Sequence, residues 1–217
     1  MAGQWLPLFP LNVVLFPHMP LPLHIFEPRY RQMLADCLEE GHSFGVVAIR
    51  EGQEMGPAVP FEVGTLAKIM RIDRLDDGRV NLLVTGASRF EILETASDRP
   101  YLRGRIRIML EAGDELEDTA GLSESTALAF REYSKLVHEL VGQAADEPEP
   151  PIEPELLSYL IAAALNLQVP EKQQLLATPR TDERLKQELR LLRKEIVLLK
   201  QMVAHAAVAG KARTSLN

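Results

Sequence analysis

The sequence predicts an α+β fold in two parts: an antiparallel β-barrel lobe with one helix over residues 1–115, and an α-helical bundle lobe over residues 120–217 that ends in a long helix. Three observations support this prediction. Through most of the first half, apolar residues recur with the period of two that is typical of strands. From Leu122 onward the period becomes helical. The last helix carries a heptad pattern of apolar residues.

The chain opens with apolar, strand-like runs that proline interrupts, since six prolines fall within the first 28 residues. Proline cannot donate a hydrogen bond to a neighbouring strand, so these runs predict edge or bent strands, as at the rim of a small barrel. A helix follows, because Pro28 suits a first helical position and Gly41 can end the helix in the left-handed conformation. Its buried face is an apolar stripe: Tyr30, Met33, Leu34, Cys37 and Leu38.

More strands are predicted between this helix and Met109. Residues 43–50 form a short apolar run. Residues 65–75 and 80–93 flank a hairpin turn in which Gly78 supplies the positive φ. The period of two ends with residues 102–109, where apolar and basic residues alternate cleanly. These runs together predict a compact, partly closed barrel with covered edges.

The basic residues of that last run, Arg103, Arg105 and Arg107, lie on one face of the predicted strand. They have two interpretations. One is a solvated face whose arginines pair with acidic residues of a neighbouring strand. The other is an RNA-binding stripe. The acidic net charge and the lack of aromatic residues on this face favour the first interpretation.

The second half predicts four helices and a connector. Ser123 is a suitable N-cap for a helix over 124–141. Residues 144–154 contain four prolines and four acids, so they predict a stiff, extended connector on the surface. Three helices follow: about 155–166, a short one that starts near Pro170, and a long one that starts at Asp182 with Thr181 as its cap.

The long helix carries apolar residues that step by four and three in alternation: Leu185, Leu189, Leu192, Ile196, Leu199, Val203 and Ala206. This heptad seam can pack on the other helices of its own lobe, or it can join a second copy of the chain in a homodimer. Leu191 and Leu198 widen the apolar face beyond a strict seam, which favours packing within the lobe.

Composition narrows the class of protein. The net charge is −7, with −4 from 12 basic and 16 acidic residues in 1–115 and −3 from 12 and 15 in 116–217. Neither half is basic, which argues against a nucleic-acid partner. The single cysteine, Cys37, excludes an internal disulfide and a cysteine-rich zinc site. No apolar run is long enough to span a bilayer, and no signal peptide is recognisable, so we expect a cytoplasmic protein with no membrane partner.

The residue patterns of catalytic and cofactor sites are missing. The one Gly-Lys pair, Gly210-Lys211, is followed by alanine, and His205 stands where a phosphate-binding loop needs its first glycine. Ser134 and Lys135 are neighbours on a predicted helix, so their side chains diverge and do not form a nucleophile and base. No histidine, cysteine or acidic pair has zinc-like spacing. We therefore expect a protein that is not an enzyme and that needs no cofactor.

Three stretches resemble a known family: Leu6-Pro7-Leu8-Phe9-Pro10-Leu11, Ile25-Phe26-Glu27-Pro28-Arg29-Tyr30 and Leu83-Val84-Thr85-Gly86-Ala87-Ser88-Arg89-Phe90. Together with residues 61–67 and the pattern of 154–185, they resemble the Lon amino-terminal domain, also called the Lon substrate-binding domain. The likeness is strongest to its stand-alone bacterial form and to the Lon domain of cereblon-type proteins. The resemblance implies a PUA-like barrel that binds polypeptide substrates, or a protein partner such as a protease or chaperone. Two alternatives remain: an RNA- or nucleotide-binding PUA-like barrel, and a cryptic hydrolase.

The candidate site lies at Phe26, Glu27, Pro28, Arg29 and Tyr30. In one interpretation these residues are structural: the proline starts the helix, the charged groups bind nearby backbone and the aromatic rings pack in the core. In the other they form one wall of a groove for an extended peptide. Binding would then rest on apolar contacts and on an unpaired strand edge beside them.

Overall fold

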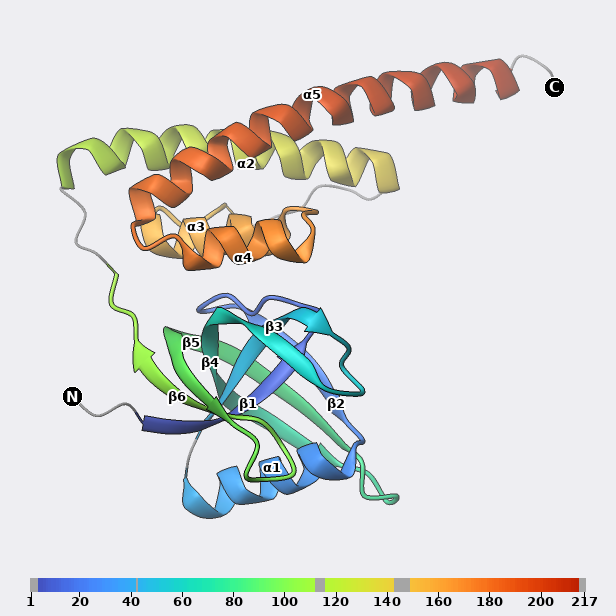
Figure 1. Cartoon of the computed structure of the whole chain (residues 1–217). Coiled ribbons are helices and arrows are strands. Elements are labelled where there is room, and N and C mark those ends of the chain that lie inside the picture. The colour runs from blue at the N-terminus through green and yellow to red at the C-terminus, as the bar shows by residue number, and fades with distance from the viewer. Residues whose placement is uncertain (1–3, 42, 112–115, 143–148, 215–217) are drawn as a thin grey trace. The chain divides into compact units, whose positions relative to one another are not determined.

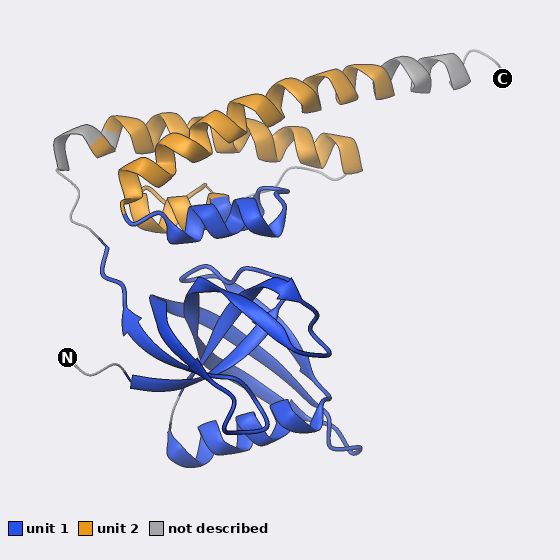
Figure 2. Ribbon diagram, in the orientation of Figure 1, with its two compact units in different colours: residues 1–112, 162–179 blue, residues 113–161, 180–217 orange. Residues whose placement is uncertain are grey.

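The computed structural model describes residues 4–41, 43–111, 116–142 and 149–214, which form six strands and five helices (Figure 1). The chain divides into two compact units (Figure 2). The first contains residues 1–112 and 162–179, and the second contains residues 113–161 and 180–217. Strands and helices are segregated along the chain, so the predicted α+β class is confirmed.

A single six-stranded sheet builds the barrel of the first unit, in the order β2-β5-β4-β3-β1-β6. Its strands are β1 (Gln4–Leu11), β2 (Pro20–Ile25), β3 (Phe44–Gly52), β4 (Ala58–Arg74), β5 (Val80–Ala96) and β6 (Arg103–Ile108). The long strand β5 closes the barrel, since residues 80–85 pair with β2 and residues 90–96 pair with β6. Two register shifts in its ladder with β4 help to bend these long strands.

Its prolines predict that β1 is an edge or a bent strand, and β1 is not an edge strand. Residues 4–7 pair antiparallel with β6 and residues 8–11 pair parallel with β3, so the strand lies within the barrel wall. The parallel pair also departs from the predicted antiparallel barrel. Its cause is the long connection between β1 and β3, because β2 and the helix α1 (Pro28–Glu40) bring the chain back to run in the same direction. β2 is the edge strand, and in the described part of the chain it pairs with β5 alone.

The helix α1 packs on the barrel core, as its apolar stripe predicts. Pro28 occupies the first turn and Gly41 ends the helix with a φ of 65°. Four of the five stripe residues are buried, and Leu38 is exposed. They join one core cluster with Phe9 and Phe44 from the strands. Cys37 lies in this cluster, and burial raises the pKa of its thiol to about 12, which makes it an unreactive core residue.

A second core cluster fills the barrel around Phe90, together with Leu6, Leu8, Val47 and Ile106. Glycine makes the room for this ring. A Cβ atom at Gly45 would lie 2.5 Å from the Phe90 ring, and one at Gly64 would lie 2.6 Å from it. Two neighbouring strands therefore approach the ring closely because they carry no side chain there.

The helix α4 (Val169–Ala177) belongs to the barrel unit, whereas the predicted boundaries assign it to the helical lobe. Its anchor is Arg89 of β5, which is 2% exposed. The guanidinium donates to the carbonyl oxygens of Leu176 at 2.7 Å and Thr178 at 2.6 Å, and it pairs with Glu111 at 2.5 Å. The Gln173 amide also donates to the carbonyl of Val63 at 2.8 Å. A buried charge thus holds the end of a helix 87 residues away in sequence.

The second unit is built on α2 (Leu116–Val141) and α5 (Thr181–Thr214), which pack against each other (Figure 1). Its buried residues include Phe130 and Tyr133 of α2 and Leu185, Leu192 and Ile196 of α5. The first half of the heptad seam therefore packs within its own unit. The prediction that Ser123 is the N-cap of this helix is wrong, because α2 begins seven residues earlier and Gly121 does not interrupt it.

Most of α3 (Pro154–Ala164) lies in the same unit, and a buried polar chain joins it to α5. Arg184 donates from Nε to the Ser158 hydroxyl at 2.6 Å, and that hydroxyl donates to Glu188 at 2.9 Å. The Arg184 guanidinium also lies 4.2 Å from the centre of the Tyr159 ring. Desolvation raises the pKa of Glu188 well above its ordinary value, and the Ser158 hydrogen bond and the charge of Arg184 only partly oppose this effect.

Candidate functional site

The five predicted site residues lie together where β2 meets α1, but they have different roles. Pro28 starts the helix, and Glu27 precedes it with extended backbone. The Glu27 carboxylate pairs with the Arg29 guanidinium at 2.9 Å. Phe26 is 48% exposed and stacks beside His24, with 6.0 Å between ring centres. Phe26 is therefore the member of the motif with a large apolar surface open to solvent.

Arg29 and Tyr30 maintain the structure of this corner. Arg29 donates to the carbonyl of Glu54 at 2.6 Å, which ties the loop after β3 to the helix. Tyr30 is 4% exposed, and its ring centre lies 4.3 Å from that of Phe9. The Arg29 guanidinium lies over the Tyr30 ring. Burial raises the pKa of the Tyr30 hydroxyl to about 12, so the ring stays neutral. The structural interpretation of the motif therefore holds for Pro28, Arg29 and Tyr30, whereas Phe26 does not pack in the core.

Two small hollows flank the corner. One, of about 70 Å³, is lined by Phe26, His24 and Met55, and Met55 is 74% exposed. The other, of about 200 Å³, is lined by Tyr30, Arg29, Ser97 and residues 99–102, among others. Each is smaller than the roughly 300–1,000 Å³ typical of ligand pockets. They could accept single side chains of a partner, and Phe26 and Met55 form the apolar rim of the first.

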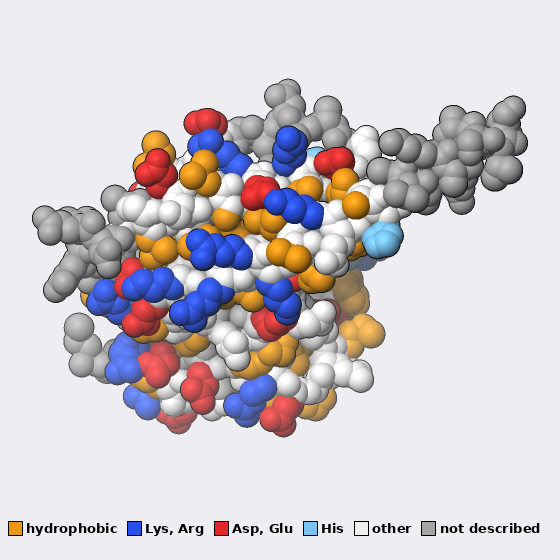
Figure 3. Space-filling model, turned by 90° about the horizontal axis from the view of Figure 1, so that it is seen from above, with side chains coloured by type: hydrophobic (Ala, Val, Ile, Leu, Met, Phe, Trp, Pro, Cys, Tyr) orange, Lys and Arg blue, Asp and Glu red, His pale blue; other side chains and the backbone are white. Residues whose placement is uncertain are grey.

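The arginine stripe of β6 is a paired, solvated face, as its first interpretation predicts. Arg103 pairs with Asp98 at 2.7 Å, Arg105 pairs with Glu94 at 3.0 Å, and Arg107 pairs with Glu91. The acids at 94 and 91 lie on β5, across the strand pair. On the face in Figure 3, basic side chains are likewise interspersed with acidic ones. The stripe therefore offers little unpaired positive charge to a phosphate backbone.

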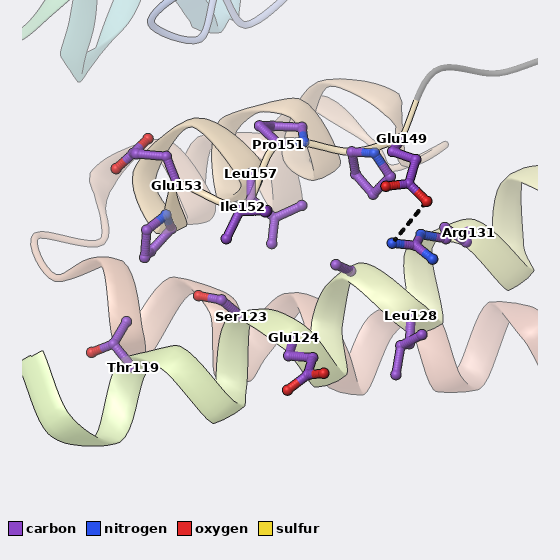
Figure 4. A pocket seen from close by; sticks show the side chains of 13 residues that line it. Thr119, Ser123, Glu124, Leu128, Arg131, Glu149, Pro151, Ile152, Glu153 and Leu157 are labelled. Atoms are coloured by element: carbon purple, nitrogen blue, oxygen red, sulfur yellow. Dashed lines mark ion pairs between the residues drawn. The ribbon is translucent and has the colours of Figure 1, made fainter.

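The helical unit has a groove that no sequence pattern predicted. It has a volume of about 740 Å³ and runs between α2 and the chain from Glu149 to Leu157 (Figure 4). Residues of α2 that are four apart form one wall, among them Thr119, Ser123 and Ala127. The proline-rich connector and the start of α3 form the other wall, and Ile152 and Leu157 point toward α2. The connector was predicted only as a surface segment, so its role in a groove was not expected.

The groove combines apolar and acidic side chains. Ile152 is 91% exposed and Leu128 is 56% exposed, whereas Leu157 at the base is buried. Glu149 pairs with Arg131 at 3.7 Å at one end of the groove (Figure 4). The Glu153 carboxylate accepts the backbone N–H of Leu156 at 2.6 Å, which fixes the start of α3. The sequence held one signal for this site, an isolated isoleucine inside an acidic, proline-rich segment.

Within the described ranges, no three histidine, cysteine, aspartate or glutamate side chains come together in a way that could hold a metal ion. No helix in those ranges is long and apolar enough to cross a membrane. The groove and the corner each combine exposed apolar side chains with a hollow.

Comparison with known proteins identifies what this arrangement is similar to. Residues 5–194 match the family described as the ATP-dependent protease La (LON) substrate-binding domain. A Lon protease of Anaeromyxobacter dehalogenans is 32% identical over 200 residues, which is 90% of this chain and 24% of that protein. The chain therefore spans about a quarter of the length of this relative.

Two solved structures share the fold. A Lon N-terminal domain protein from Xanthomonas campestris is 28% identical, with a TM-score of 0.62, and the match covers 86% of this chain and 98% of that one. The N-terminal domain of a Mycobacterium avium complex Lon protease has a TM-score of 0.69 at 19% identity and covers 88% and 98%. At that identity, the second match supports the fold alone.

Proposed function

Because the chain belongs to the family of Lon substrate-binding domains, we propose that it is a non-catalytic module that binds polypeptide segments. The observation that carries the proposal is the family match over residues 5–194. The exposed apolar side chains at the corner and in the groove support it, because apolar contact is how a protein can hold many different unfolded segments. The partner can be an unfolded substrate, or a protease or chaperone to which this module docks.

At the barrel corner, we propose that Phe26 and its neighbour Met55 contact the polypeptide. Glu27, Pro28, Arg29 and Tyr30 hold the corner in shape, so their contribution is rigidity. An apolar side chain of the partner would enter the hollow that Phe26 lines. Burying one such side chain contributes about 1.5–3 kcal/mol, so several contacts are needed for a dissociation constant of about 10 µM.

Side-chain contact is favoured over strand addition at this corner. Pro20 and Pro22 of β2 have no N–H, so they occupy the positions whose backbone groups point away from β5. The outer edge of β2 therefore lacks two consecutive donors. An added strand could not complete its hydrogen bonds there, which is one way that natural proteins protect an exposed edge.

A polypeptide partner is also favoured over RNA. The arginines of β6 are paired with acids, and the whole chain carries a charge of −7.

A homodimer through α5 remains a further proposal. It would use Val197, Leu198 and Met202, which are exposed on the second half of that helix. Sedimentation at two protein concentrations would detect it.

The proposed function is tested by titrating reduced and carboxymethylated lactalbumin, which stays unfolded in buffer, against the purified chain. We expect binding at about 10 µM that changes little between low and high salt, because apolar contacts are not screened. Replacing Phe26 by serine should weaken binding about tenfold. Leu93→Ser is the matched control, since Leu93 is 42% exposed on β5 and lines neither hollow.

Absence of binding would contradict the proposal. Turnover of ATP or cleavage of casein that follows the chain through purification would contradict its non-catalytic part. A single serine substitution that stopped such cleavage would favour the hydrolase alternative.

A further inference from the structure

The groove of the helical unit carries features that the general function does not explain. Isolated exposed apolar residues are normal on protein surfaces. Here, however, Ile152 of the connector and Leu128 of α2 both line one concave space. Its volume of about 740 Å³ lies within the range of ligand-binding sites, roughly 300–1,000 Å³. Ile152 is 91% exposed, so a partner that covers its side chain makes the free energy of binding more favourable.

A buried hydroxyl in the groove also lacks a partner. Ser123 is 5% exposed, and its Oγ atom makes no hydrogen bond with any residue that the structure describes. Nearby hydroxyls of α2 behave differently: Thr126 and Ser125 donate to carbonyls four residues earlier. Buried polar atoms are nearly always hydrogen-bonded. Because this atom is itself buried, a backbone group of a bound segment would reach it only if the Ser123 side chain turned toward the groove.

The charge of the groove selects the partner. Its lining contains three carboxylates, Glu124, Glu149 and Glu153, and one guanidinium, Arg131, which gives a local charge of −2. The pair between Arg131 and Glu149 is solvent-exposed and 3.7 Å long, so it is weak and a competing cation can replace it. Glu153 is held in position by its bonds to the backbone of α3.

From these features we infer that the groove binds apolar polypeptide segments flanked by lysine or arginine. This inference rests on the proposed function and adds a preference to it. The apolar side chains of the segment cover Ile152 and Leu128, and its cations face the carboxylates. Glu149 and Glu153 are four residues apart, which separates their backbones by at most about 14 Å. Two basic residues four positions apart in an extended segment match this spacing.

The test uses a fluorescent peptide, Gly-Ser-Lys-Leu-Ala-Leu-Lys-Ser-Gly, and measures its anisotropy with the full chain. A second peptide has both lysines replaced by glutamate, and a third has both leucines replaced by serine. We expect the first peptide to bind about tenfold more tightly than either of the others. Its affinity should fall in high salt, unlike that of the carboxymethylated protein.

Variants locate the binding. Ile152→Ser should weaken the first peptide about tenfold, and Glu149→Gln should weaken it about threefold. Val141→Ser is the matched control, because Val141 is an exposed apolar residue of the same unit that does not line the groove. Circular dichroism checks that each variant is folded.

Equal binding of the lysine and glutamate peptides, or an unchanged affinity in Ile152→Ser, would overturn the inference. If lactalbumin binds and the lysine peptide does not, the groove inference fails and the proposed function stands. If neither binds, both fail.

Discussion

The barrel corner and the helical groove differ in how much of their side-chain surface the fold itself uses. At the corner, Arg29 binds the loop at Glu54 and Tyr30 packs against Phe9, so most of a conspicuous sequence motif is structural. In the groove, Ile152 stands in solvent and Ser123 has no described partner. A sequence motif can thus mark a rigid corner, while the surface available to a ligand lies beside it or in a segment with no motif.

This contrast has energetic consequences. Substitutions at the structural residues of the corner should lower stability, whereas substitutions at exposed residues of either surface should change binding alone.

The largest effect is expected at Tyr30. Replacing it by alanine removes a ring that is 4% exposed and leaves a cavity beside Phe9, which should cost about 3–5 kcal/mol of unfolding free energy. Ile152→Ser should cost less than about 0.5 kcal/mol, since that side chain is already in solvent. Urea unfolding measures both. Similar losses in the two variants would break the distinction between the corner and the groove.

A second large effect is expected at Arg89, which anchors α4 to the barrel. Arg89→Met keeps an unbranched apolar stem but removes the guanidinium that donates to the carbonyls of Leu176 and Thr178, so about 2–4 kcal/mol should be lost. Hydrogen exchange should quicken in α4. The control is Arg107→Met. It removes the exposed ion pair between Arg107 and Glu91, which should cost about 0.5 kcal/mol of unfolding free energy. Unchanged exchange in α4 would show that other contacts hold it.

A smaller, pH-dependent effect is expected at Glu188. Its pKa is raised in the folded protein, chiefly by burial, so its contribution to stability is fully present below the unfolded pKa, about 4.3. That contribution is lost as the pH rises toward the higher folded value. Glu188→Gln should therefore lose less stability than the parent chain between pH 5 and pH 8. Glu183→Gln, on the exposed side of the same helix, should follow the parent curve, and identical curves for all three would contradict this account.

Local signals in the sequence were sufficient for much of the fold. Pro28 and Gly41 bound α1 as predicted, and Gly78 has a φ of 80° in the predicted turn. These features depend on the backbone preferences of single residues, which act over a few positions. The burial of Cys37 follows equally from helical periodicity.

Long-range contacts explain what the sequence did not predict. The parallel pairing of β1 with β3 depends on where the chain returns after α1. The grouping of α4 with the barrel depends on Arg89, a charged residue that no local pattern would bury. The groove forms only when the connector lies along α2, so the place of Ile152 in a binding site could not be predicted without the tertiary structure.

The central claim, that this chain binds polypeptides through exposed apolar side chains, is tested most directly by photo-crosslinking. Lactalbumin carrying benzophenone groups would be irradiated with the full chain, and the crosslinked residues would be found by mass spectrometry. We predict crosslinks at the corner, around Phe26 and Met55, and in the groove, around Leu128 and Ile152. Crosslinks confined to other surfaces, such as the exposed half of α5 at Val197 and Met202, would contradict the claim.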